Sequence, residues 1–222
     1  MPVTSVAHSL LKNELIFRHL GMCDYENIWR NMQAFNENRD KQTPDEIWFL
    51  QHPPVYTLGL NGKPEHILTH SDIPVIKSDR GGQVTYHGPG QLVCYVMLDI
   101  ARFGIGVKKL VWLLEQSVID LLKTFDIDST RRQNAPGVYV DDAKIAALGL
   151  RVRKHCSYHG LSLNVDMNLN PFKNINPCGY EDLVITQLKD LGIREDISLV
   201  QTNLQKHLQR LLLTTQTVKI NE

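Results

Sequence analysis

The chain's densest run of glycine and polar residues is Arg80-Gly81-Gly82-Gln83-Val84-Thr85-Tyr86-His87-Gly88-Pro89-Gly90-Gln91. It lies within residues 73–100, whose β-branched residues predict short strands near 74–77, 83–87 and 91–99. A plain β-hairpin with glycine turns at both ends would explain the glycines. It would not explain why Arg80, Thr85 and His87 stand together, so the run is a candidate ligand-binding segment.

Toward the N-terminus, the sequence alternates between strand and helix patterns. Residues 14–20 predict a first strand, and Asp24 is a candidate N-cap for the helix that follows. The apolar residues of this helix share one face: Tyr25, Ile28, Trp29, Met32 and Phe35. Two further strands are expected at 47–50 and 55–58, separated by Pro53-Pro54, which a central strand does not tolerate.

Toward the C-terminus, the clearest pattern is a long amphipathic helix over residues 107–125. Residues 137–165 then predict a β-meander, broken near Asp141-Asp142 and near Ser157. Leucines at helical spacing predict a closing helix over 198–214.

This order of elements predicts an α/β (α+β) fold in which helices pack on a mixed or mostly antiparallel sheet. No long linker divides the chain, so we expect residues 1–222 to form one domain, with 195–222 as a helical C-terminal extension. The net charge is zero, which does not favour binding to nucleic acid or to an anionic membrane surface. No signal peptide and no apolar run long enough to span a membrane stand out, so a cytoplasmic protein is expected.

Four cysteines are present, and in the cytoplasm they are expected to be reduced thiols: Cys23, Cys94, Cys156 and Cys178. They form no CxxC pair, and in an extended strand His155 and Cys156 point to opposite faces, so no metal site is expected. Cys94 lies in an apolar run where packing explains it. Cys23 precedes a helix but has no other feature of a reactive thiol.

Cys178 is the strongest candidate nucleophile, because it stands between Pro177 and Gly179. Proline fixes the backbone before the thiol, and glycine permits a sharp turn after it. A thiol that forms a thioester needs such access, together with nearby N–H donors for the oxyanion. A buried cysteine that only packs in a loop is the alternative.

Lys144 is a candidate activator of a thiol, since it opens an apolar stretch followed by small residues. An ammonium near a thiolate lowers the pKa of the thiol and can assist proton transfer. A lysine on a solvated surface is the alternative, and Lys144 lies 34 residues before Cys178, so the sequence alone does not bring them together.

Together these segments resemble the motifs of the lipoyl(octanoyl) transferase family over roughly residues 14–190. The run from Thr85 to Gln91 is the most specific signature. The other matching segments are Gly137-Val138-Tyr139, Lys144-Ile145-Ala146-Ala147-Leu148-Gly149, His159-Gly160-Leu161-Ser162-Leu163-Asn164 and Pro177-Cys178-Gly179.

The resemblance implies a fold like the catalytic domain of biotin and lipoate protein ligases, and a reaction in two steps. Cys178, activated by Lys144, would take an octanoyl group from octanoyl-acyl carrier protein as a thioester. The acyl group would then pass to a lysine of a lipoyl domain, in the E2 subunits of 2-oxoacid dehydrogenases or in the glycine-cleavage H protein, with no cofactor. It also implies an acyl site formed by Arg80, Gly81, Gly82, Gln83, Val84, Thr85, Tyr86, His87, Ala147, Leu148, Gly149, Gly160, Leu161 and Ser162.

Two other functions are weighed against this one. An ATP-dependent lipoate or biotin ligase would share the fold, but it would need an arginine-rich glycine loop and no thiol. A non-catalytic protein that binds acyl carriers or lipoyl domains would have no use for a nucleophile paired with a lysine.

Overall fold

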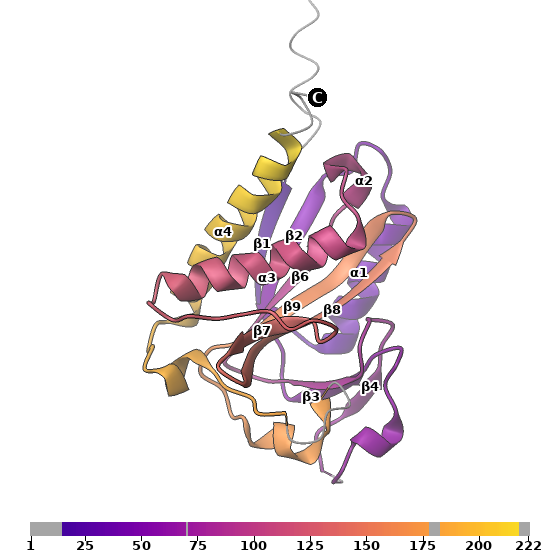
Figure 1. Ribbon diagram of the computed structural model, residues 1–222. Helices are drawn as coiled ribbons and strands as arrows, with labels where there is room; N and C mark the ends of the chain where they lie inside the picture. The colour runs from indigo at the N-terminus through magenta and orange to yellow at the C-terminus, as the bar shows by residue number, and fades with distance from the viewer. Residues whose placement is uncertain (1–14, 70, 178–182, 218–222) are drawn as a thin grey trace, which may run out of the picture.

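The computed structural model describes residues 15–69, 71–177 and 183–217 (Figure 1). A six-stranded sheet forms its centre, with the strand order β1-β2-β6-β9-β8-β7. β1 and β2 run parallel, and every other neighbouring pair is antiparallel, so the sheet is mixed. The strands are β1 (Leu15–Met22), β2 (Asp45–Gln51), β6 (Gln91–Met97), β7 (Gly137–Val140), β8 (Ala143–Arg153) and β9 (Cys156–Asn164).

Helices cover both faces of this sheet. α1 (Tyr25–Asn38) lies on one face, and α3 (Val107–Lys123) crosses the other together with α4 (Ile197–Thr217) (Figure 1). Successive side chains of β6 point to opposite faces of the sheet, so this strand contributes to the hydrophobic core on each face: Cys94 packs toward α3 and Tyr95 toward α1. Both faces of the central strands are therefore buried.

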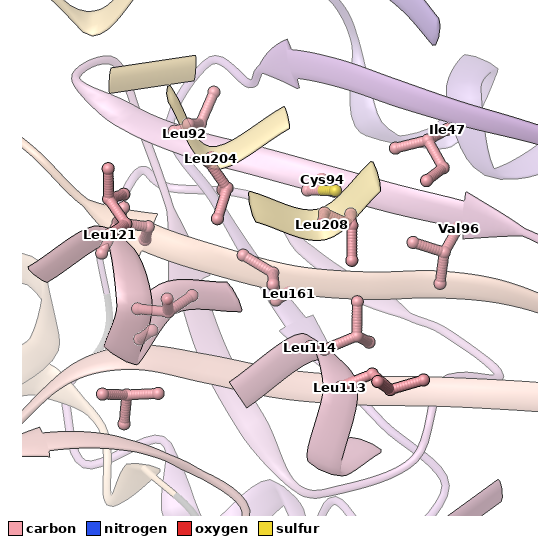
Figure 2. Close-up of a cluster of buried hydrophobic side chains, with 14 of the residues drawn as sticks. Ile47, Leu92, Cys94, Val96, Leu113, Leu114, Leu121, Leu161, Leu204 and Leu208 are labelled. Carbon is pink, nitrogen blue, oxygen red and sulfur yellow. The ribbon is translucent and has the colours of Figure 1, made fainter. Parts of the chain in front are cut away.

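The larger core lies between the sheet and the helix pair α3 and α4. Figure 2 shows Leu113, Leu114 and Leu121 of α3 gathered with Leu204 and Leu208 of α4 over side chains of the strands. All five leucines are at most 1% exposed. The predicted C-terminal helix is thus part of the main core, and no helix of the described residues is long and apolar enough to cross a membrane.

A second, three-stranded sheet packs at one end of the first, at the bottom of Figure 1. Its strand order is β4-β3-β5, from β3 (Val55–Leu58), β4 (Val75–Lys77) and β5 (Val84–His87). Short helices complete the described chain: η1 (Pro64–His66), α2 (Ile100–Phe103), η2 (Asn170–Asn174) and η4 (Leu188–Leu191). The pocket described below lies where β5 faces β8 and β9 of the large sheet.

The local sequence signals are mostly confirmed. Asp24 caps α1, because its side chain accepts a hydrogen bond from the Asn27 N–H at 3.0 Å. The break predicted near Ser157 is confirmed two residues earlier, since β8 ends at Arg153 and β9 begins at Cys156. The strands turn at Lys154 and His155, which both adopt positive φ angles. This left-handed pair matches the twist of an antiparallel hairpin.

Candidate active site

Small residues of β8 and β9 form the floor of an elongated pocket on the α1 side of the sheet. Ala147 pairs with Ser162, and one step further Gly149 pairs with Gly160. Directly opposed residues point to the same face, so these two pairs form a shallow floor with almost no side-chain bulk. All four residues line the pocket.

Two glycines of this floor are required by close backbone contacts. A Cβ atom on Gly160 would lie 2.1 Å from the carbonyl oxygen of Cys94 on β6. A Cβ atom on Gly149 would lie 2.8 Å from the carbonyl oxygen of Gly81, whose own N–H donates to the Leu150 carbonyl at 2.9 Å. The segment around Gly81 is therefore held against β8 and closes over the pocket.

The opposite wall comes from the glycine-rich run. Arg80 is buried, and its guanidinium donates to the Thr57 hydroxyl at 3.0 Å and to the carbonyls of Gly81 and Gln83 at 3.0 and 2.7 Å. These bonds hold the turn in shape. The predicted acyl-site residues that line the pocket are Arg80, Gly82, Gln83, Val84, Thr85, His87, Ala147, Leu148, Gly149, Gly160, Leu161 and Ser162.

Two predicted residues do not line this pocket. Tyr86 alternates to the other side of β5, where its ring packs 5.6 Å from the ring of Tyr56 and 5.4 Å from that of Phe172, measured between centroids. Gly81 contributes through its backbone bond to Leu150. Both support the wall from behind.

Lys144 is buried beside the pocket, only 3% exposed. Its Nζ donates to the Pro136 carbonyl at 3.3 Å and lies 5.2 Å from the centre of the Tyr139 ring. A Cβ atom on Gly137 would lie 3.3 Å from that Nζ, so glycine leaves space for the ammonium. Burial of a charged amine is costly unless polar partners surround it, and such lysines occur most often where function needs them.

A small cavity lined by Lys144 adjoins this pocket. Its walls include Thr85, Ala147 and Ser162, which the two spaces share, and also Pro177 and Ile185. The backbone of Lys144 bonds to the segment containing Ile185: its N–H donates to the Val184 carbonyl at 2.8 Å, and its carbonyl accepts from the Thr186 N–H at 3.0 Å.

The predicted nucleophile Cys178 lies outside the described residues. Pro177, directly before it in the sequence, lines the Lys144 cavity, and the chain is hydrogen-bonded to Lys144 again from Val184 onward. The other three cysteines are free thiols, and burial raises the pKa of each of them: Cys23, Cys94 and Cys156. A raised pKa leaves little thiolate at neutral pH.

Three buried residues with ring side chains outside the predicted acyl-site set also line the pocket, and of these only His159 lies in a predicted motif. Tyr25 of α1, Tyr95 of β6 and His159 of β9 all contribute, and each is at most 4% exposed. Tyr25 and Tyr95 stand in apolar patterns typical of core residues. Only the position of His159, next to the Gly160-Leu161-Ser162 motif, could have indicated a site.

Comparison with known proteins decides the family. The model of the lipoyl protein ligase A/B catalytic domain matches residues 24–209. The octanoyltransferase of Aromatoleum aromaticum is 57% identical over 198 residues, covering 89% of this chain and 86% of that protein. The chain belongs to the octanoyltransferase family. It is thus an acyltransferase, as the motifs around His87 and Gly149 predict.

The solved structures that superpose on this octanoyltransferase show which other proteins share its fold. Lipoate-protein ligase A bound with ATP superposes with a TM-score of 0.72 and 14% identity, covering 90% of this chain and 85% of that one. Biotin protein ligase from Aquifex aeolicus gives a TM-score of 0.53 at 13% identity, with coverages of 92% and 71%. The predicted fold, that of the biotin and lipoate ligase catalytic domain, is confirmed.

Proposed function

We propose that this octanoyltransferase carries the octanoyl group on Cys178, taking it from octanoyl-acyl carrier protein and passing it to a lysine of a lipoyl domain. The acceptors are the E2 subunits of 2-oxoacid dehydrogenases and the glycine-cleavage H protein. One observation carries the proposal: the chain lies beside buried Lys144 on both sides of Cys178. Pro177, before it, lines the same cavity as Lys144, and Val184 and Thr186, after it, are hydrogen-bonded to the Lys144 backbone. This arrangement favours a thiol close to the ammonium.

In the first step, the Cys178 thiolate attacks the thioester carbonyl of the carrier. The tetrahedral intermediate collapses with loss of the carrier thiolate, which takes a proton from the Lys144 ammonium, and the octanoyl group is left on Cys178. The ammonium of Lys144 stabilises the attacking thiolate, because opposite charges attract strongly in a site shielded from water. Exchange of one thioester for another is nearly isoenergetic, so this step needs no nucleotide.

In the second step, the amine of the acceptor lysine attacks the octanoyl thioester. The amine loses a proton, the Cys178 thiolate leaves, and an amide forms. Lys144, acting as a neutral amine at this stage, accepts the proton and becomes an ammonium again beside the restored thiolate. A thioester is less stable than an amide, which makes the transfer downhill.

The acyl chain lies in the pocket over Ala147, Ser162, Gly149 and Gly160. Burial of its seven carbons beyond the carbonyl would contribute about 6 kcal/mol, at about 0.8 kcal/mol per carbon. The three other cysteines are poor alternatives as nucleophiles, since burial raises the pKa of each. A reduced thiol and a carrier-bound thioester both fit a cytoplasmic location.

The test is intact-mass measurement after incubation with octanoyl-acyl carrier protein, without ATP. We expect a gain of one octanoyl group that hydroxylamine removes and that Cys178→Ala abolishes. Cys156→Ala, which removes a partly exposed thiol of the described chain, is the matched control and should acylate normally. An adduct that requires ATP, or that persists in Cys178→Ala, would contradict the proposal and favour a ligase or another nucleophile.

A further inference from the structure

His159 has an unusual backbone for a residue in a strand. Its φ angle is +59°, a left-handed conformation that non-glycine residues rarely adopt. Strict alternation along β9 would send its side chain toward α3, where Leu161 and Leu163 point. Instead its ring stacks on that of Tyr158, with centroids 5.1 Å apart, and meets the ring of Tyr95 edge-on at 5.9 Å, both on the α1 side. A strained backbone conformation persists where neighbouring groups hold it in place, and it often marks a functional residue.

Asp79 is what fixes His159. Its carboxylate accepts hydrogen bonds from Trp29 Nε1 at 2.7 Å, from Gln33 Nε2 at 3.1 Å, from His159 Nε2 at 2.9 Å and from the Tyr158 hydroxyl. Burial raises the pKa of this carboxyl, but the bonds from His159, Tyr158 and Gln33 outweigh burial and hold the pKa well below its usual range. Asp79 is therefore ionised and only accepts, which places a proton on His159 Nε2.

The other ring nitrogen of His159 then carries a lone pair. Burial lowers the pKa of His159, so the ring is neutral near pH 7 and Nδ1 bears no proton. Among the described residues, nothing donates to this buried Nδ1. His159 is 1% exposed and lines the pocket, so this wall contains an acceptor, shielded from water, that no described residue satisfies.

The pocket floor indicates where an acyl chain would end. Beyond the Ala147–Ser162 and Gly149–Gly160 pairs, the next pair is Arg151–Tyr158, where the floor rises from small groups to a phenol ring. Successive pairs on one face lie about 7 Å apart. Eight carbons joined by seven bonds, each advancing about 1.25 Å along the zigzag of an extended chain, extend at most about 9 Å. An octanoyl chain that starts at the Lys144 cavity thus ends over the glycines, next to His159.

We propose that His159, positioned by Asp79, forms a polar end wall of the acyl pocket and discriminates against longer alkyl chains. Nδ1 is already shielded from water and has no hydrogen-bond partner among the described residues. A methyl group packed against it would leave it without a hydrogen bond, whereas a chain ending in a hydroxyl would donate to it. The acyl site so defined takes eight-carbon chains, and beyond them only chains with a donor at the far end. The inference rests on the proposed function for the direction of the chain.

The test compares nonanoate with 8-hydroxyoctanoate, two acids of equal length that differ in a terminal methyl or hydroxyl. Calorimetric binding to the wild-type chain should favour the hydroxy acid about tenfold. His159→Phe keeps a ring but removes the acceptor, and it should reduce this ratio to about one. Asp79→Asn should reduce it as well, because an amide no longer fixes the tautomer of His159.

The matched control is His155→Phe, a substitution of the same kind on the same hairpin. His155 also has a positive φ angle, of 65°, but its side chain is exposed and outside the pocket. This variant should retain the wild-type ratio of the affinities for the two acids. The ratio does not depend on how much of each protein is folded, because an unfolded fraction reduces the binding of both acids equally. Equal ratios in wild type and His159→Phe, or binding of neither acid, would overturn the inference. Because binding is measured, the result is separate from the mass test of Cys178 acylation.

Discussion

The substitution Gly160→Ala tests the close approach of the two central strands. The added Cβ atom would lie 2.1 Å from the Cys94 carbonyl oxygen and 3.1 Å from its carbonyl carbon, whereas ordinary contact begins at 3.4 Å. The obstacle is backbone, and both β6 and β9 are held by strands on either side, so neither can move away freely. We expect the crowding to cost about 3 kcal/mol of the free energy of unfolding.

For a chain of this length, each kcal/mol shifts the melting temperature by about 2–4 °C, so Gly160→Ala should melt about 6–12 °C below wild type in a thermal scan followed by circular dichroism. Gly106→Ala is the control. Gly106 precedes α3 with a φ of −94°, and a Cβ atom there would meet nothing within 4 Å. Its melting point should stay within about 2 °C of wild type. A Gly160→Ala protein as stable as Gly106→Ala would refute the strand spacing described above.

Two further outcomes are expected. Lys144→Met should slow acylation of Cys178 by at least about a hundredfold and raise the pH at which iodoacetamide labels that thiol, and unchanged labelling would remove Lys144 from the activating role. Burial lowers the pKa of His52 to about 4, so below the ordinary value of 6.5 the unfolded chain binds one more proton than the native one. The free energy of unfolding should therefore fall from pH 6.5 toward pH 4 by up to about 1.4 kcal/mol per unit, and urea titrations of His52→Gln should lack that part of the slope.

Much of the fold could be predicted from the sequence, because burial on two faces leaves a periodic pattern. The apolar run around Cys94 predicts a central strand, and the leucines from Leu204 onward predict a helix that the structure packs into the main core. The strands of the second sheet were predicted, at 55–58 and near 74–77 and 83–87, but not that they form a sheet of their own, since the sequence pattern does not show which strands pair. The prediction that residues 1–222 form one catalytic domain stays a prediction.

The sequence predicts those parts of the site where a close approach of the backbone requires a particular residue. Gly149 and Gly160 belong to recognisable motifs because backbone passes directly over or beside them. Tyr25 and Tyr95 were missed because, in sequence, an aromatic residue facing a pocket cannot be told from one in the core. The turn of His159 toward the pocket depends on a φ angle that no periodicity records. The catalytic roles of Cys178 and Lys144 remain predictions for the experiments above.

The two backbone hydrogen bonds between Lys144 and the chain at Val184 and Thr186 have a consequence for engineering. They fix the position at which the chain after Cys178 returns to Lys144. The distance between the Cys178 thiol and the Lys144 amine would therefore depend on the number of residues between Pro177 and Val184 more than on their identity. Inserting a single residue there should uncouple the reactive pair while leaving both side chains intact. Designed variants that seek new acyl groups should therefore reshape the floor and end wall of the pocket and keep this segment at its native length.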